Sequence, residues 1–446
     1  MTAAPAPTTA RAGRCPRRPL PQGASRPSDV LVRFLANGVA YLVAAGAAGV
    51  WDTFGNEPRA HWLALHLAFV GAVSLMVLGA SQFFATAFLM TVPPPKRLIR
   101  AQLATWNLGT ILVAVGVFER RETLTDIGAV ALLAGLVFFT LALRGLMRSS
   151  LQRAHWAVRW YMASALCLGA GAILGALMAR GTWIDGGSIL GAHIALNVGG
   201  WFGTAIVGTL HTFYPSLTHT PLRHPRLQAP AFGAWVGGVL VLALGYALGA
   251  DAIVVLGWLS LAVAATLLAT NLIASRRAAT DLRLPARLVG AAQPFLVAGL
   301  VVALVGALHD GWLAPLPGPQ RDAVGALLVT GWVGLTVSGS LLHLLSILSR
   351  VRTLGAALPA PTPRRDVAIT VAAVIAVTAT ALSQASALDF LASPARLALA
   401  AVAATIAVLL AAELRGIARA FIKPGPPLSP RLRAPAPAGP APRRAR

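Results

Sequence analysis

The sequence is short of charge, and above all of acid. Only 11% of its 446 residues are charged, and only 14 are Asp or Glu. A soluble protein of this length needs more charge to cover its surface. Hydrophobic residues make up 57% of the chain and the mean hydropathy is +0.71. The composition therefore predicts a polytopic membrane protein.

Cysteine and the familiar catalytic motifs are scarce as well. Cys15 and Cys167 are the two cysteines of the chain, and they exclude both a disulfide framework and a Cys-x-x-Cys metal site. There is no Walker loop, no HExxH zinc motif and no plausible Ser/His/Asp set. No carboxylate falls in the middle of an apolar run, which disfavours a carboxylate-driven proton pump or ion-coupled transporter.

What the sequence does contain is long apolar runs. About twelve of them approach the ~20 residues that a bilayer requires, and they predict twelve transmembrane spans. The spans cover residues 31–51, 61–91, 99–118, 125–147, 158–178, 187–216, 229–249, 252–274, 288–309, 323–348, 367–388 and 394–417. We expect a helical domain over residues 29–421 between two Pro-, Ala- and Arg-rich tails, residues 1–28 and 422–446, which are too polar to fold alone.

Charge is distributed unevenly between the gaps. Lys96, Arg97 and Arg100 fill the second gap, and basic residues return in every alternate gap and in both tails, whereas most acids lie in the other gaps. The positive-inside rule then predicts that both termini are cytoplasmic and that the chain is a multi-pass protein of the cytoplasmic (inner) membrane. Membrane lipid is thus the expected partner of the basic residues, and the net charge of +23 does not call for nucleic acid.

A nine-residue motif recurs along the chain. GWFGTAIVG (residues 200–208) aligns with GWVGLTVSG (331–339), which lies 131 residues later, and more weakly with GAVSLMVLG (71–79), which lies 129 residues earlier. These segments fall in spans two, six and ten. They predict an all-α membrane protein with a pseudo-threefold repeat of four-helix units. Chance matching in a chain rich in Ala, Gly and Leu is the alternative.

Two histidines mark the ends of span six. His193 and His211 are 18 residues apart, which is five helical turns, so they share a face and lie about 27 Å apart. A polar face of this kind should point into the bundle, because lipid would leave its polar groups without partners. The supporting residues in this helix, on or beside that face, are Asn197, Gly200, Trp201 and Thr204.

Depth sorts the histidines of the spans into two layers. The predicted outer, metal-binding cluster consists of His61, His66, His193 and His309. The predicted inner layer consists of His211 and His343, with Gln82 at the matching position of the first repeat. Imidazole is the usual nitrogen ligand of haem iron and copper. We therefore predict that His66, His193, His211 and His343 bind a cofactor, haem b and/or copper; interhelical hydrogen bonding or placement at the membrane interface is the alternative for each.

Twelve spans, threefold repetition and histidines in spans two, six and ten resemble haem-copper oxidase subunit I and NnrS-type haem and copper membrane proteins. The stretch HIALNVGGWFGTAIVGTLHTFYPSL is also similar to the membrane region found with actinobacterial copper nitrite reductases or multicopper oxidases. The resemblance implies that His66 matches the low-spin haem ligand and His193 the copper ligand, and that His343 lies on a helix that supplies haem ligands. Residues 229–249 contain no histidine, so the oxidase's adjacent copper-binding pair is missing, and a complete oxygen-reducing centre is not expected.

The expected function is haem or copper binding in membrane redox or nitrogen-oxide-related chemistry. An extracytoplasmic copper protein or an electron-transfer partner is the expected protein partner. Whether the protein is itself an enzyme stays open. Two alternatives also remain open: a transporter or channel for a small solute or metal, and a cofactor-free scaffold for an extracytoplasmic copper oxidase.

Overall fold

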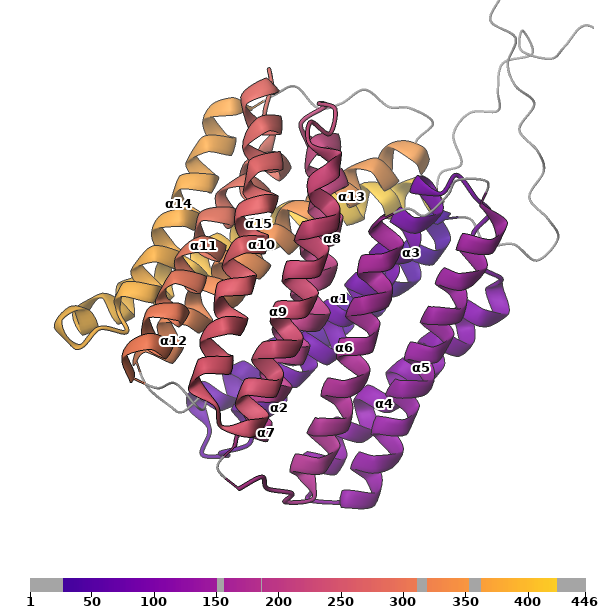
Figure 1. Cartoon of the computed structure of the whole chain (residues 1–446). Coiled ribbons are helices and arrows are strands. Elements are labelled where there is room, and N and C mark those ends of the chain that lie inside the picture. The colour runs from indigo at the N-terminus through magenta and orange to yellow at the C-terminus, as the bar shows by residue number, and fades with distance from the viewer. Residues whose placement is uncertain (1–26, 151–155, 186, 311–318, 353–361, 423–446) are drawn as a thin grey trace, which may run out of the picture. The chain divides into compact units, whose positions relative to one another are not determined.

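The regular structure of the chain is helical throughout the part that can be described. The computed structural model describes residues 27–150, 156–185, 187–310, 319–352 and 362–422 (Figure 1). Twelve helices in these ranges are long and apolar enough to cross a membrane. The prediction of an all-α membrane protein with twelve spans is confirmed. Apart from residues 27, 28 and 422, the two predicted tails lie outside the described residues.

The helices fall into three successive groups of four spans. The first group is α1 (Pro27–Phe54), then α2 (Ala60–His66) continued by the π-helix η1 (Leu67–Val73) and α3 (Ser74–Phe88), then α4 (Lys96–Phe118) and α5 (Glu122–Ser149). The second is α6 (Trp156–Ala179), then α7 (Ile189–Ile194) with η2 (Ala195–Gly203) and α8 (Thr204–Leu217), then η3 (Pro225–Leu227) with α9 (Gln228–Leu248), and α10 (Asp251–Ala278). The third is α11 (Leu284–Asp310), then α12 (Pro319–Gly325) with η4 (Ala326–Gly334) and α13 (Leu335–Arg352), then α14 (Pro363–Leu382), and η5 (Ser386–Leu391) with α15 (Ala392–Ile422).

Contacts divide the chain into two compact units, Met1–Val158 and Arg159–Arg446. The first unit holds α1 to α5, which is the first predicted repeat. The second unit holds the other two repeats, apart from the first residues of α6. The division therefore falls where the sequence predicts a boundary between repeats.

The second span of every group contains a π-helix. η2 and η4 are each nine residues long and end on the last glycine of the Gly-Trp-x-Gly motif, Gly203 and Gly334. η1 covers seven residues at the matching place in the first group. Well under 1% of residues in proteins adopt this conformation. Three π-helices at matching places indicate that the repeat is structural and not a chance match of glycines.

Glycines of this span pack against the first helix of the same group. In each group, two glycines lie so close to that helix that an added Cβ would overlap a neighbouring side chain. The pairs at the first position are Gly71 with Tyr41 (2.5 Å), Gly200 with Cys167 (2.5 Å) and Gly331 with Phe295 (2.7 Å). Those at the second are Gly79 with Phe34 (2.5 Å), Gly208 with Trp160 (2.2 Å) and Gly339 with Val289 (2.9 Å). Small residues let helices approach closely in lipid, and here they do so at the same two places in each repeat.

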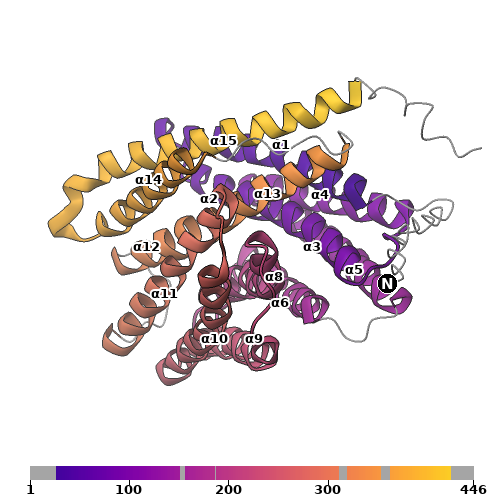
Figure 2. The ribbon, with the colours of Figure 1, turned by 90° about the horizontal axis from the view of Figure 1, so that it is seen from above.

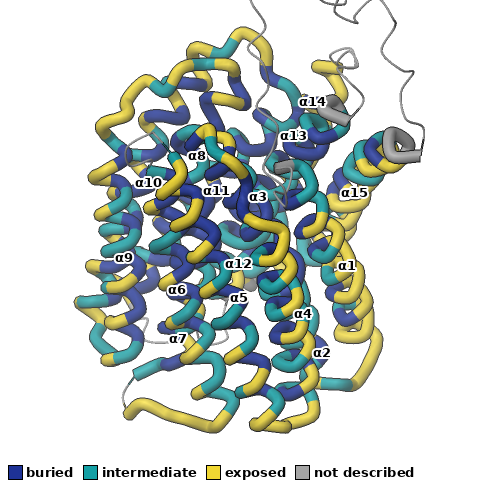
Figure 3. The backbone as a smooth tube through the Cα atoms, turned by 90° about the vertical axis from the view of Figure 1, so that its right-hand side faces the viewer, coloured by how far each residue is buried: buried dark blue, intermediate teal, exposed yellow. Residues whose placement is uncertain are grey.

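The third and fourth spans form tight hairpins in the first two repeats only. A Cβ on Gly128 of α5 would lie 2.7 Å from Val113 of α4, and one on Gly257 of α10 would lie 2.7 Å from Leu242 of α9. The last hairpin, α14 with α15, has no glycine in α14, and its helices meet at η5 (Figure 2). Only 11% of the most apolar stretch of the last span is buried, and α15 is largely exposed (Figure 3).

Span six is the most buried of the twelve. Of its most apolar stretch, 67% is buried, against at most 44% in any other span. Leu240, Leu244 and Leu248 of the neighbouring α9 are exposed, as expected for a face in contact with acyl chains. The helix that carries His193 and His211 is thus the one most enclosed by protein.

Asp366 joins the beginnings of two helices in the third repeat. The side chain is 8% exposed, and its Oδ2 accepts a hydrogen bond from the backbone N–H of Leu284, the first residue of α11 (3.0 Å). Its Oδ1 accepts from the Thr362 hydroxyl (3.1 Å) and from Arg365 (3.3 Å). We expect Asp366→Ala to lower the free energy of unfolding by about 1–3 kcal/mol, because it leaves a buried donor without an acceptor. Thermal melting of the detergent-purified protein measures this.

Asp281→Ala is the matched control for this prediction. Asp281 is three residues before Leu284, its side chain is 61% exposed, and its oxygen is 3.9 Å from Arg283. Exposed ion pairs of this kind contribute little, so the control should melt like the unaltered protein. Equal melting temperatures for both variants would contradict the role given to Asp366.

Candidate functional site

The first candidate group is at the start of span six, around His193. Nδ1 of His193 lies 2.8 Å from the carbonyl oxygen of Gly171 on α6. The Asn197 amide donates to the His193 carbonyl (2.8 Å) and its nitrogen lies 3.3 Å from Nδ1. Asn197, one of the predicted supporting residues, thus contacts His193 directly.

The short contact with Gly171 defines the protonation of the His193 ring. A carbonyl oxygen 2.8 Å from a ring nitrogen requires a proton between them, so Nδ1 is the donor and Nε2 carries a lone pair. Two glycines of α6 leave room for this arrangement. A Cβ on Gly171 would lie 2.4 Å from the Asn197 amide, and one on Gly175 would lie 3.0 Å from Cε1 of His193.

The π-helix η2 begins two residues after His193, and an indole from another helix donates a hydrogen bond to it. Nε1 of Trp235, on α9, donates to the carbonyl oxygen of Gly199 (3.1 Å), and the Thr204 hydroxyl approaches the same oxygen (3.3 Å). The Gly199 carbonyl also accepts the π-helical hydrogen bond from the backbone N–H of Thr204. The Trp235 indole and the Thr204 hydroxyl are therefore additional donors to this oxygen. Trp201 and Gly200 are buried beside them.

The first repeat has the same kind of hydrogen bond from an indole to its π-helix. Nε1 of Trp106, on α4, donates to the carbonyl oxygen of Val70 in η1 (3.0 Å). Trp106 and Trp235 are 129 residues apart, as are Val70 and Gly199. Sequence reasoning missed both tryptophans, although this equal spacing was visible in the sequence.

The third repeat lacks the tryptophan. Gly200 and Gly331 face Val239 and Val377 respectively, which makes these two valines equivalent. Four residues before them stand Trp235 and Ala373. Trp235 of the second repeat is next to the π-helix of the third repeat as well, since its ring lies 5.6 Å from that of Trp332 in η4.

A second candidate group surrounds His211 at the other end of span six. His211 is 0% exposed, and its Nδ1 lies 3.3 Å from the side-chain nitrogen of Asn271 on α10. Its ring packs 6.1 Å from that of Trp160. Nε2 of His211 has no hydrogen-bond partner among the described residues. The two histidines of span six thus differ in their hydrogen bonds: Nδ1 of His193 faces a backbone carbonyl, whereas Nδ1 of His211 faces a side-chain amide.

The first unit contains three of the predicted site residues. Nδ1 of His66 lies 2.9 Å from the carbonyl oxygen of Trp62, on whose ring the imidazole stacks at 3.9 Å. His61 is exposed and pairs with Asp52 (3.0 Å). Gln82 is 1% exposed, and its amide donates to Gln102 of α4 (3.2 Å).

Charged groups of the first unit gather in the loop near His61. Nε of Arg59 lies 2.8 Å from Oε1 of Glu57, and its guanidinium lies 5.0 Å from the centre of the Phe118 ring. The hydrogen bonds from Arg59 hold the pKa of the Glu57 carboxyl below its ordinary value. These contacts tie the loop before α2 to the end of α4.

The remaining two candidates lie in the third repeat. His343 of α13 is half-buried, and its ring meets that of Phe213 edge to face at 5.5 Å. His309 is exposed at the end of α11. Phe213 is two residues after His211, so His343 lies near the same end of span six as His211.

The structure assembles pairs of predicted residues, but no larger set of metal ligands. Among the described residues, no three side chains of His, Cys, Asp or Glu come together as they would around a metal ion. His61 and His66 belong to one unit and His193 and His309 to the other, so the outer cluster stays a prediction. The cofactor role of His66, His193, His211 and His343 also stays a prediction.

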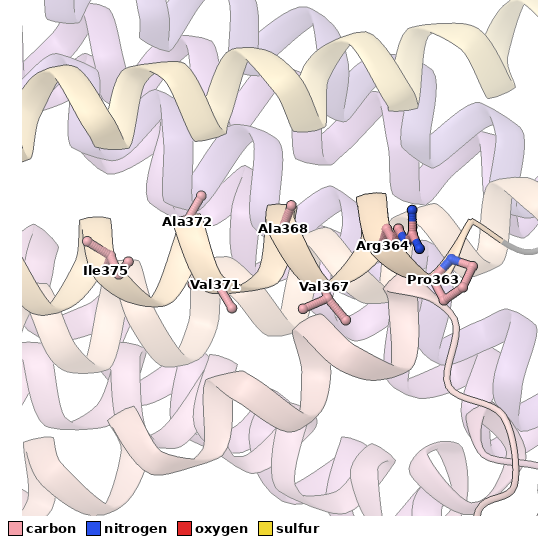
Figure 4. Close-up of a pocket in the computed structure, with 7 residues that line it drawn as sticks. All are labelled: Pro363, Arg364, Val367, Ala368, Val371, Ala372 and Ile375. Carbon is pink, nitrogen blue, oxygen red and sulfur yellow. The ribbon is translucent and has the colours of Figure 1, made fainter.

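A shallow groove of about 690 Å³ runs along α14 (Figure 4). Its lining consists of Pro363, Arg364, Val367, Ala368, Val371, Ala372 and Ile375. One helix supplies all of these residues, none of which is a candidate ligand. The groove has the character of a surface covered by acyl chains.

Comparison of the sequence with models of known protein families gave no match, and comparison with curated proteins gave none either. The function therefore has to be argued from the residues around His193, His66 and His211.

Proposed function

We propose that the protein is a haem-binding membrane protein of redox or nitrogen-oxide-related chemistry, with His193 as an iron ligand in the second unit and His66 in the first. The observation that carries the proposal is the 2.8 Å hydrogen bond between Nδ1 of His193 and the Gly171 carbonyl. We also propose that the protein spans the cytoplasmic membrane several times and has both termini on the cytoplasmic side.

The protonation of the two imidazoles, with the proton on Nδ1, suits them as iron ligands. A histidine that binds metal through Nε2 almost always donates its Nδ1–H to a carbonyl or carboxylate, which fixes the tautomer and the ring orientation. His193 does so to Gly171, and His66 does so to Trp62 within its own helix. Asn197 and the side-chain-free Gly171 and Gly175 then keep the His193 ring in place.

Haem suits these residues better than a copper centre built from the chain alone. Haem iron needs one or two axial nitrogens, whereas protein copper sites use three or more ligands. No group of three such ligands occurs in the described ranges. Copper at His193 would have to take further ligands from elsewhere, so copper is the second choice.

Bound haem would supply one-electron transfer, and the chain would supply binding and orientation. Trp235 would fix the π-turn that follows His193, and with it the direction of the ring. The predicted protein partner is an extracytoplasmic copper protein or another electron carrier at the outer surface.

An absorption spectrum tests the proposal directly. The full chain, expressed with ample haem and purified in detergent, should show a Soret band and contain iron on metal analysis. His193→Ala should lose most of this band. His219→Asn is the matched control: His219 lies in a loop with φ +53, which asparagine tolerates, and the band should be unchanged.

The outcome also separates the alternatives. A protein without a Soret band and without bound copper would overturn the proposal. If solute uptake by vesicles then remained, the transporter class would replace it. A cofactor-free protein that still assembled with a copper oxidase would be a scaffold.

A further inference from the structure

The group around His211 has a property that haem ligation does not use. His211, Trp160 and Ser275 are 0% exposed and Asn271 is 1% exposed. The four residues come from α6, α8 and α10, all in the second unit. Asn271 and Ser275 are one turn apart on α10, so both face the same way.

The orientation of the Asn271 amide follows from the backbone of His224. Its Oδ1 accepts from the His224 N–H (2.9 Å), and its Nδ2 donates to the His224 carbonyl (3.1 Å). If the amide were flipped, its NH₂ group would face the His224 N–H and its oxygen would face the His224 carbonyl, so neither hydrogen bond could form. The second hydrogen of Nδ2 is then directed at Nδ1 of His211, 3.3 Å away.

This arrangement determines the tautomer of His211. Nδ1 accepts from Asn271, so the proton of the neutral ring is on Nε2. His211 is therefore the opposite of His193, whose Nε2 carries the lone pair. A metal ligand needs that lone pair; an Nε2–H group needs an acceptor instead.

Three polar atoms of this group have no hydrogen-bond partner among the described residues. They are Nε2 of His211, Nε1 of Trp160 and Oγ of Ser275. Indole and this imidazole nitrogen can only donate, and a hydroxyl can donate as well. Buried donors without acceptors cost about 1–3 kcal/mol each in proteins, and a membrane interior offers no bulk water to satisfy them.

The first repeat has unpaired polar atoms at the matching place. Gln82 aligns with His211, and there Oε1 of Gln82 and Nε2 of Gln102 lack hydrogen-bond partners within the described part of the chain. In the third repeat the matching residue is Leu342. Two repeats thus keep a polar group that helix packing alone does not require.

We propose that the His211 group is a binding site for a small oxygen acceptor, a water molecule or a small oxyanion, held by the Nε2–H of His211, with the Trp160 ring 6.1 Å from the imidazole and Ser275 one turn beyond Asn271. The dense burial of all four residues limits the ligand to a few atoms. The two donor-only groups select an acceptor over a cation. The site does not depend on haem binding at His193.

Solid-state NMR of the full chain in lipid bilayers, labelled with ¹⁵N-histidine, tests the site. The His211 signals are those that disappear in His211→Gln. We expect Nε2 to be protonated and Nδ1 not. In anion-free buffer, magnetisation transfer from water to this Nε2–H identifies bound water. A shift of the same signal on adding nitrite, with chloride as reference, identifies an oxyanion.

The repeats supply two matched variants. His211→Gln introduces the residue of the first repeat and keeps a donor, so nitrite or water binding should be retained, as read from the indole N–H of Trp160 in protein labelled with ¹⁵N-tryptophan as well. His211→Leu introduces the residue of the third repeat and should abolish it. A protonated Nδ1 in the unaltered protein would overturn the proposal. So would the absence of both water transfer and a nitrite shift, and neither result depends on how the variants fold.

Discussion

Gly208→Ala is expected to lower the melting temperature and the yield of the protein more than any other single alanine substitution considered. The added Cβ would lie 2.2 Å from Cγ and 2.3 Å from Cβ of Trp160. These atoms are at the base of a fully buried side chain, so they cannot move unless α6 moves away from α8. Overpacking of this kind costs about 1–3 kcal/mol and sometimes more. Melting in detergent, followed by size-exclusion chromatography, measures the loss.

The control for Gly208 is Gly237→Ala, in α9 of the same unit. Nothing lies within 4 Å of the Cβ that this substitution would add. Alanine is the better helix former by about 1 kcal/mol, so the control should melt at or slightly above the temperature of the unaltered protein. If Gly208→Ala melted like Gly237→Ala, the close contact between α6 and α8 would be wrong.

Trp235→Phe is expected to have the second largest effect. The substitution keeps an aromatic ring beside Trp332 but removes the N–H that serves the Gly199 carbonyl. The carbonyl keeps the backbone N–H of Thr204, so the lost hydrogen bond and the smaller buried ring together should cost about 1–3 kcal/mol. The π-turn would then lose one of its donors, and the backbone next to His193 would be held less firmly, so we expect a lower melting temperature together with a weaker or broader Soret band.

Two further tryptophan substitutions serve as controls for Trp235→Phe. Trp183 is 89% exposed, and Trp183→Phe should change neither the melting temperature nor the spectrum. Trp106→Phe removes the equivalent hydrogen bond of the first repeat and should destabilise to a similar degree, without altering the environment of His193. An unchanged melting temperature for Trp235→Phe would show that the π-turn does not need its indole donor.

Much of the architecture could be predicted because each membrane span is determined by a continuous apolar stretch of the sequence. The apolar runs predicted twelve spans, and the recurring glycine motif predicted three groups of four. The contact between His193 and Asn197 could also be anticipated, since residues four apart share a helix face. In each case the signal and the structure it produces lie within one stretch of chain.

The features that define the candidate site depend on distant residues and could not be read in this way. The tautomer of His211 depends on Asn271, 60 residues away, and on the backbone of His224. The π-turns have no strong local signature, because nearly the same residues would form an α-helix. Their stability depends on an indole from the next span, 36 residues later in both repeats that have it.

The three π-helices also bear on the history of the chain. A π-turn contains one residue more than the α-turn it replaces, and a one-residue insertion into an α-helix produces such a turn. We infer that this insertion occurred once, in an ancestral four-helix protein, before that protein was triplicated; otherwise the same turn was altered on three separate occasions. Ala373, where the other copies have tryptophan, then marks a change made after the copies had become separate. The ancestor already had the irregular helix, and its descendants diverged in how they support it.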